Sequence, residues 1–169
     1  KVKAVQQYIK ELLAAGKKFL VFCHHQVMMK GVESLLEKEG VGYIKIDGSV
    51  ASQARKELLD KFQTQDRVRV AVLSITAASC GITLTAANLV VFAELFWNPG
   101  TLRQAEDRAH RIGQTGSVVC QYLLARGTAD DILWPMIQKK LEVLQRAGLS
   151  EDNFQDMEES YTKEARTLL

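Results

Sequence analysis

Two arginines stand close together in the segment QAEDRAHRIGQ, which begins at Gln104. Arg108 and Arg111 are three positions apart, so on a helix both guanidinium groups would lie on one face. Guanidinium groups stabilise the negative charge that spreads over a phosphoryl group during its transfer. The alternative interpretation is a solvated helix whose arginines are balanced by Glu106 and Asp107. The spacing makes Arg108 and Arg111 candidate catalytic residues.

The composition limits what kind of protein can present these arginines. The chain has 169 residues, of which 47% are hydrophobic, enough for one domain with a core. Its formal net charge is only +2, so phosphate binding must come from placed residues and not from bulk charge. The chain begins with Lys1 instead of Met, and we expect it to be a piece of a longer protein. No apolar run reaches the length of a membrane span, so no membrane partner is expected.

Apolar runs alternate with segments of helical periodicity along the chain. The predicted strands are FLVFC (19–23), YIKI (43–46), VRVAVL (68–73), LVVFAEL (89–95) and VVCQYLLA (118–125). Helices are predicted over residues 4–14, 26–40 and 52–62, and a further helix carries the arginine motif. Short links in a βαβ pattern predict an α/β fold with a mainly parallel central sheet and helices on both faces.

Polar or glycine-marked stretches follow four of the predicted strands. His24 follows the first strand, Gly48 and Ser49 follow the second, and Ser74 opens the segment after the third. The fourth strand leads into FWNPG and then into the arginine motif. In parallel sheets, ligands gather beyond the carboxyl ends of the strands. The sequence therefore predicts a binding site at this rim.

Each of these stretches also has a structural interpretation. The segment SITAASCGITLTAA is a tight turn in which Gly81 supplies an unusual backbone angle, or a loop whose amides approach a phosphate or ribose. It lacks G-x-x-x-x-G-K-[ST], so it is not a P-loop. In IDGSV, a plain Asp-Gly turn is favoured, although Ser49 is also suited to cap the next helix. Backbone amides of Gly48 and Ser49 would equally suit a nucleic-acid phosphate.

A metal site is not predicted. His24 and His25 are adjacent to Cys23, but His110 is distant, and the cysteines lack ligand spacing. Zinc needs about four ligands in a defined geometry. We expect the histidines to contact phosphate or neighbouring side chains. The three widely spaced cysteines indicate buried thiols in a reducing compartment.

Five segments, in this order and spacing, resemble the second RecA-like lobe of the SWI/SNF-type ATPases of the superfamily-two helicases. They are FLVFCHH, IDGSV, SITAASCGITLTAA, FAELFWNP and QAEDRAHRIGQ. The resemblance covers residues 1–147 and implies a RecA-like three-layer αβα sandwich. The segments FAELFWNPG and GTADDILWPMIQKKLEVL resemble the annealing-helicase branch, specifically HARP-domain helicases that rewind DNA at stalled replication forks. The helix at about 128–147 resembles the family's brace helix, and residues 148–169 are expected to be an acidic, loosely held tail.

The resemblance implies roles for residues that match the family's motifs. Arg111 corresponds to the arginine finger and Arg108 to its companion. The residues implied on the nucleotide side are Gly81, Gln104 and Thr83. Many relatives have asparagine where Thr83 stands, so its contact with nucleotide stays open. The residues expected to contact the DNA backbone are Gly48, Ser49, Ser74 and His24.

The resemblance also implies a function that needs a second lobe. The chain would be the C-terminal motor lobe of an ATP-dependent DNA annealing helicase, an enzyme of replication-fork repair in the nucleus. ATP with Mg²⁺ would be held mainly by the N-terminal lobe, so the isolated fragment is expected to be inactive. The implied partners are that lobe, forked or branched DNA, single-strand/double-strand junctions and, through other regions, a single-strand-binding protein.

Three alternatives stay open at this point. The first is a non-catalytic lobe that binds DNA or protein, and the second is a nucleosome-remodelling ATPase of the same family. A free-standing dinucleotide enzyme is disfavoured because no G-x-G-x-x-G follows the first strand.

Overall fold

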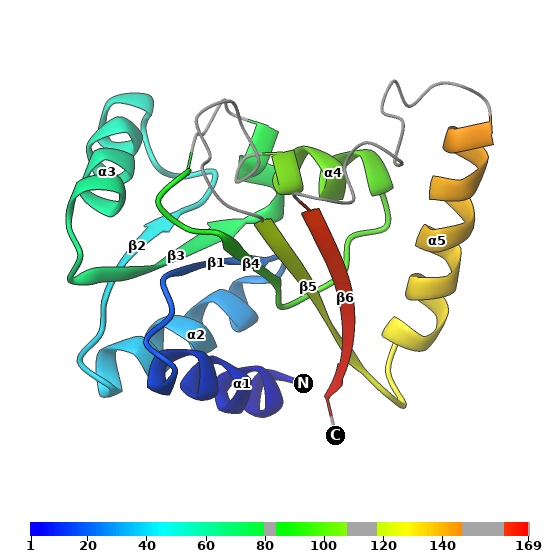
Figure 1. The fold of residues 1–169 in the computed structure, drawn as a ribbon, viewed down its shortest axis with the longest axis horizontal. Helices are drawn as coiled ribbons and strands as arrows, with labels where there is room; N and C mark the ends of the chain where they lie inside the picture. Colours follow the sequence, from blue (N-terminus) through cyan, green and yellow to red (C-terminus); the bar gives the residue numbers. More distant parts are fainter. Residues whose placement is uncertain (80–83, 108–117, 147–160, 169) are drawn as a thin grey trace.

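The computed structural model describes residues 1–79, 84–107, 118–146 and 161–168, and it confirms the predicted alternation of strands and helices (Figure 1). Along the chain the elements are α1 (Val2–Ala14), β1 (Phe19–Cys23), α2 (Gln26–Lys38), β2 (Gly42–Ile46), α3 (Ser52–Thr64), β3 (Val68–Ser74), a 3₁₀ helix η1 (Ile75–Ser79), β4 (Leu89–Phe92), α4 (Pro99–Asp107), β5 (Val118–Ala125), α5 (Asp130–Arg146) and β6 (Tyr161–Leu168). The α5 bounds agree with the helix expected at about 128–147.

The strands form one sheet in the order β2-β3-β1-β4-β5-β6, and every neighbouring pair is parallel. The predicted RecA-like α/β fold is confirmed. The fourth strand is shorter than predicted, because it ends at Phe92 and not at residue 95. The chain turns away there, since the Glu94 carboxylate is directed to the backbone that follows β1.

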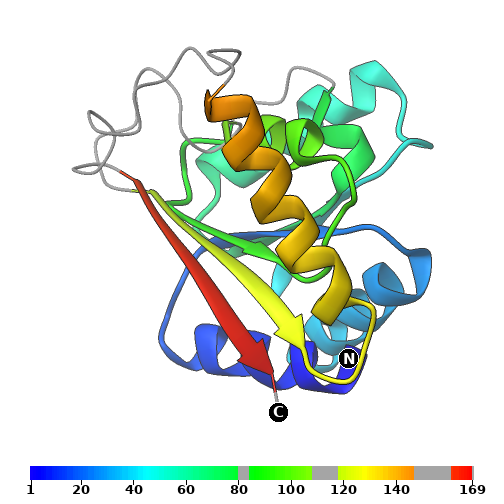
Figure 2. The same ribbon diagram turned by 90° about the vertical axis from the view of Figure 1, so that its right-hand side faces the viewer.

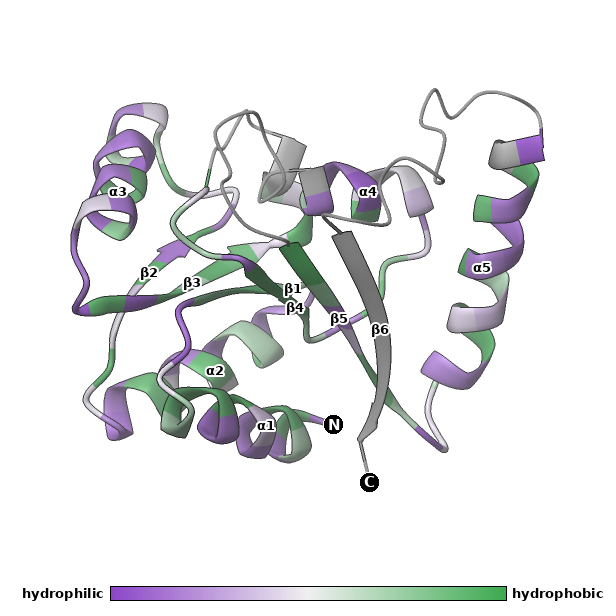
Figure 3. Cartoon of the chain, viewed as in Figure 1, coloured by the Kyte–Doolittle hydropathy of each residue, from purple (hydrophilic) through white to green (hydrophobic). Residues whose placement is uncertain are grey.

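Two apolar layers hold the helices against the two faces of the sheet. All five residues of β1 are buried: Phe19, Val21 and Cys23 pack with α1 and α2, while Leu20 and Phe22 pack on the other face. That second face is covered by α3, α4 and α5 (Figure 1). Burial on both faces explains why the strands are nearly continuous apolar runs. The hydrophobic colour of the central strands contrasts with the polar colour over much of the helices (Figure 3).

The last part of the chain differs from the expected loose tail. Residues Tyr161–Leu168 form β6, which pairs along the whole length of β5, from Val118 opposite Tyr161 to Ala125 opposite Leu168 (Figure 2). Without it, β5 would present an edge of unpaired N–H and C=O groups, which readily accepts another strand. Residues 148–160 lie outside the described part of the chain.

The described cysteines, Cys23 and Cys120, are buried free thiols, and burial raises the pKa of the Cys23 thiol above its usual range. Cys80 lies outside the described residues. Among the helices described, none has both the length and the apolar character that a membrane crossing requires.

Candidate functional site

The carboxyl ends of four neighbouring strands lie level with one another. Cys23 pairs with Ser74, Phe22 with Phe92, and Ile46 with Leu73. The segments that leave β2, β3, β1 and β4 therefore start side by side, in that spatial order. We call these strand ends and the segments that leave them, including η1, the rim. The rim brings together the described residues predicted to contact DNA.

At the end of β2, a buried carboxylate organises the Asp-Gly turn. Asp47 is only 7% exposed, and its Oδ1 accepts hydrogen bonds from the Ser49 amide at 2.9 Å and hydroxyl at 2.5 Å. These hydrogen bonds lower the pKa of Asp47, with smaller contributions from Lys45 and Gln26. Both donors of Ser49 are thus used inside the turn. Ser49 does not cap α3, whose N-cap position is Ala51.

Gly48 and Ser74 differ in how open they are. Gly48 is exposed, and a Cβ atom built on it would meet nothing within 4 Å, so a strand backbone has room to approach it. Ser74 is only 6% exposed, and its hydroxyl lies 2.8 Å from that of Thr76, which is exposed. The proposed DNA contacts of Gly48, Ser49 and Ser74 stay predictions. Thr76, which the sequence analysis did not single out, presents the more accessible hydroxyl.

The adjacent histidines are held by Glu94, a residue that the sequence analysis missed. Backbone N–H groups of His24 and His25 both donate to Glu94 Oε2 at 2.8 Å, and His25 Nδ1 lies 2.8 Å from Oε1. The His24 ring also meets Phe96 edge-on, with 4.9 Å between ring centroids. One acidic side chain thus joins the ends of β1 and β4. The signal was an acid inside the apolar run FAELF.

The described residues contain no group of three or more histidines, cysteines or acids arranged to hold a metal ion. Glu94 is instead committed to two backbone amides and a ring nitrogen, an arrangement suited to fixing a turn.

The segment FWNPG forms the beginning of α4. Asn98 Oδ1 accepts a hydrogen bond from the Gly100 amide at 2.9 Å, and Pro99 occupies the first helical position. Trp97 is 58% exposed, with Lys140 of α5 placed 5.4 Å from its ring centroid. The turn therefore sets the start of α4, on which the arginine motif begins at Gln104, and ties it to α5.

The first half of the arginine motif is described, and it is only partly solvated. Gln104 is exposed on α4, whereas Glu106 is 3% exposed and accepts a hydrogen bond from the Tyr122 hydroxyl of β5. The interpretation of a fully solvated helix is therefore wrong for Glu106. Helix α4 packs directly against η1, so two segments predicted to serve the nucleotide are neighbours.

The remaining predicted nucleotide and catalytic residues lie outside the described part of the chain: Gly81, Thr83, Arg108 and Arg111. Their roles stay predictions. What the structure gives is the two elements, η1 and α4, from which these segments continue.

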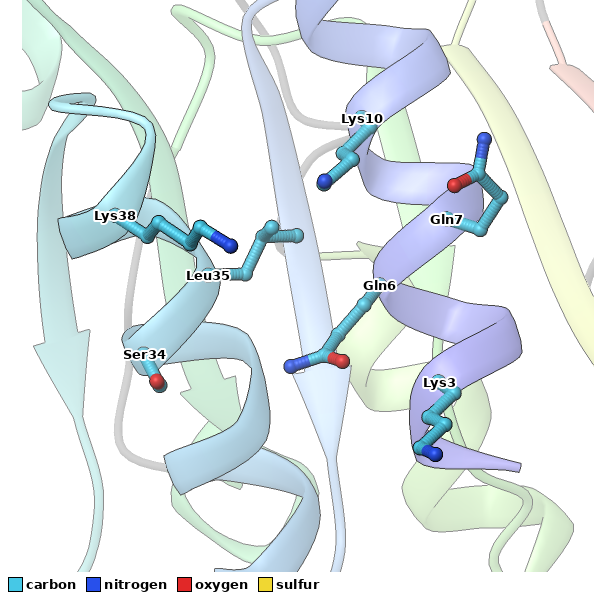
Figure 4. A pocket seen from close by; sticks show the side chains of 7 residues that line it. All are labelled: Lys3, Gln6, Gln7, Lys10, Ser34, Leu35 and Lys38. Carbon is cyan, nitrogen blue, oxygen red and sulfur yellow. The ribbon is translucent and has the colours of Figure 1, made fainter.

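A second hollow lies between α1 and α2, on the helices that cover the other face of the sheet (Figure 4). We call it the α1–α2 groove. Its volume is about 300 Å³, and it is lined by Lys3, Gln6, Gln7, Lys10, Ser34, Leu35 and Lys38. Gln6 Nε2 donates to the Gly31 carbonyl at 2.8 Å, and Lys10 pairs with Glu39 at 3.3 Å. None of the predicted site residues lines it.

Comparison with known proteins shows which family this chain belongs to. The helicase conserved C-terminal domain matches residues 1–113, which is more than half of the chain. The chain belongs to this helicase family. The solved structure of the C-terminal part of the Fun30 ATPase domain superposes on 80% of the chain and 44% of its own length, with a TM-score of 0.74 and 29% identity.

Relatives within the helicase family confirm the predicted resemblance to SWI/SNF-type and annealing helicases. A "SWI/SNF-related matrix-associated actin-dependent regulator of chromatin subfamily A-like protein 1" from Xenopus tropicalis is 58% identical over 95% of this chain. The human "DNA annealing helicase and endonuclease ZRANB3" is 50% identical over 85% of it. The chain spans 17% of the first protein and 13% of the second.

Proposed function

We propose that this chain is the C-terminal motor lobe of an ATP-dependent DNA annealing helicase that rewinds single strands and remodels stalled replication forks. The observation that carries the proposal is the packing of α4 against η1, which makes the two motif-bearing segments neighbours. The identity to a protein named as a DNA annealing helicase supports the choice of reaction. A relative named as a regulator of chromatin supports action in the nucleus.

The described residues fit one half of an ATP site. Gln104 is exposed on α4, and α4 packs against η1, the element that precedes the segment containing Gly81 and Thr83. Arg108 and Arg111 would face the phosphates from this lobe. ATP with Mg²⁺ would supply the phosphoryl group and its counter-ion, both held mainly by the N-terminal lobe. This chain's part is to orient and to stabilise charge.

The DNA contact would be made along the rim, without selection of sequence. The Gly48 backbone, the hydroxyls of Ser49 and Ser74, and His24 are proposed to face phosphates of forked DNA or of a single-strand/double-strand junction. ATP hydrolysis would open and close the cleft between the two lobes and so move the bound DNA strand. A single-strand-binding protein is proposed as a partner of regions beyond this chain.

The test uses the complete protein that contains this chain. We expect ATP-dependent annealing of complementary strands and an ATPase stimulated more by forked DNA than by nucleosomes. The isolated 169-residue chain should hydrolyse no ATP. If nucleosomes stimulated the ATPase more strongly than forked DNA, the proposed reaction would be nucleosome remodelling instead of annealing. If the complete protein bound DNA but hydrolysed no ATP, the chain would be a non-catalytic binding lobe.

A further inference from the structure

One buried hydrogen bond joins the arginine-motif helix to the sheet. The Tyr122 hydroxyl on β5 donates to Glu106 Oε1 on α4, and the two residues are 4% and 3% exposed. Glu106 precedes Arg108 by two positions in the same motif. The acid is therefore placed where it can fix the last described turn of α4, immediately before the arginines.

The donor side of this hydrogen bond is held rigidly by stacked rings. Phe22 of β1 stacks on Phe92 of β4, with centroids 5.2 Å apart, and Phe92 stacks on Tyr122 at 4.5 Å and 5°. Trp134 of α5 contacts the Tyr122 ring at 5.1 Å. The ladder crosses three neighbouring strands and ends on a helix, which restricts the Tyr122 ring and hence the position of its hydroxyl.

The surroundings make this hydrogen bond costly to lose. Glu106 and Tyr122 line a small space of about 30 Å³ between α4 and α5, together with Arg103 and the apolar side chains of Leu102, Trp134 and Ile137. A carboxylate removed from water is stable only when its oxygens are hydrogen bonded. Burial first, and the Glu106 charge second, raise the pKa of Tyr122 well above its ordinary value, so the hydroxyl keeps its proton and remains a donor.

We propose that Tyr122 and Glu106 are positioning residues of the motor, which orient α4 so that Arg108 and Arg111 reach the phosphates. The proposal rests on the proposed function. Neither residue needs to touch ATP, because the hydrogen bond acts through the direction of the helix. Small errors in the placement of a catalytic group cost large factors in rate. Trp134 of α5 contacts the Tyr122 ring, so a displacement of α5 would also shift the Tyr122 hydroxyl that orients α4.

The primary test is Tyr122→Phe in the complete two-lobed protein, because it removes only the donor and keeps the stacked ring. We expect kcat for DNA-dependent ATP hydrolysis to fall about tenfold, with KM for ATP and the Kd for forked DNA changed by less than about twofold. The measurement is made well below the melting temperature of the variant, so unfolding does not contribute.

The chain offers a matched control in Tyr43→Phe. Tyr43 also donates to a glutamate, Glu37 of α2, at 3.0 Å, but this hydrogen bond is exposed, and Tyr43 lies on β2 at the far edge of the sheet. We expect this variant to keep wild-type kcat. Glu106→Gln keeps an oxygen acceptor for Tyr122 and should lose less activity than Tyr122→Phe. Glu106→Leu removes the acceptor and should lose at least as much.

A double mutant separates positioning from general stability. If Tyr122 acts through both arginines, then Tyr122→Phe should lower kcat by a smaller factor in an Arg111→Ala background than in the wild-type protein. Wild-type kcat in folded Tyr122→Phe, or full additivity with Arg111→Ala, would overturn the positioning role. Wild-type turnover in Arg111→Ala would instead overturn the proposed function on which it rests, so the two failures are distinguishable.

Discussion

The rim and the α1–α2 groove are both polar, but they hold their polar groups in different ways. At the rim, the carboxylates of Asp47 and Glu94 each accept at least two hydrogen bonds, from neighbouring backbone or side-chain donors. Of the groove residues, Lys10 pairs with the carboxylate of Glu39, and both side chains of that pair are about 40% exposed. The groove is a hollow of about 300 Å³ with long lysine side chains along it, whereas the rim holds its carboxylates in fixed hydrogen bonds.

The presence of a hollow is therefore not enough to assign function to the groove. Long lysine side chains over a groove lose conformational entropy when they bind, and solvent screens their charge. Carboxylates that accept hydrogen bonds from backbone amides lose little conformational entropy on binding, because the fold has already oriented them. A motor lobe of the kind proposed must hold its contacts through repeated cycles, and this requirement favours the rim as the proposed site.

The largest effect is expected for Arg111→Ala in the two-lobed protein. DNA-dependent ATP hydrolysis should fall by about three to five orders of magnitude, since arginine fingers act on charge that develops in the transition state. ATP affinity should change much less. Arg111→Lys should rescue little, because an ammonium group cannot present the planar fork. Near-normal turnover with saturating forked DNA would overturn the proposed motor function.

Arg108→Ala should impair the same step. We expect the double variant Arg108→Ala with Arg111→Ala to lose less than the product of the two single effects, because both arginines serve one phosphate site. Thermal melting of each variant checks that the fold is kept. Independent, multiplicative losses would show that the two arginines serve different sites.

Glu94→Ala at the rim should reduce the stability of the fold more than a matched change beside the groove. Its carboxylate accepts hydrogen bonds from two backbone amides, and hydrogen bonds to charged groups contribute about 1.5–3 kcal/mol each. We expect the free energy of unfolding of the isolated chain to fall by about 3 kcal/mol in urea titrations. Glu39→Ala, in the exposed pair of the groove, is the control and should cost about 0.5 kcal/mol or less. Equal losses would remove the distinction between the two regions.

A smaller effect is expected from Ser49→Ala, and it should depend on pH. The Ser49 hydrogen bonds lower the pKa of Asp47, so the charged carboxylate stabilises the fold above its unfolded pKa of about 3.9. This stability is lost as the pH falls through the lower, folded pKa. The variant should therefore be less stable than wild type by about 1 kcal/mol at pH 7, with a difference that shrinks below about pH 4. A difference independent of pH would contradict this coupling.

Periodicity made most of the fold predictable, because each of the strands β1 to β5 is a short, largely apolar run that alternates with helical segments. The end of β4 was not, since a single side chain, Glu94, decides where the chain turns, and its partners are 69 and 70 residues away. The strand β6 was missed because its sequence is polar and its pairing depends on the free edge of β5. Such long-range partners leave little trace in local patterns.

For the candidate site, the sequence predicted residues that the structure brings to one rim, but it did not predict the supporting side chains. The common position of His24, Gly48, Ser49 and Ser74 was predictable because they follow strands whose carboxyl ends are level. Glu106 entered the sequence analysis only in the alternative interpretation, as an acid of a solvated helix, since nothing in its own helix signals the hydroxyl of Tyr122, 16 residues further on. Residues that orient others are recognised only when their partners are known.

The smallest effect is expected from the groove itself. The triple variant Lys3→Gln, Lys10→Gln and Lys38→Gln keeps long polar side chains but removes three positive charges. A lysine that neutralises a phosphate of duplex DNA steepens the slope of log K against log salt by about 0.9, so its removal makes the slope shallower by that amount. We expect this slope, the affinity for forked DNA and ATP turnover to stay at wild-type values, and stability to change by less than about 0.5 kcal/mol. If the slope for the triple variant were shallower by about two or more, the groove lysines would contact DNA phosphates. The rim would then be only one part of the DNA-binding surface.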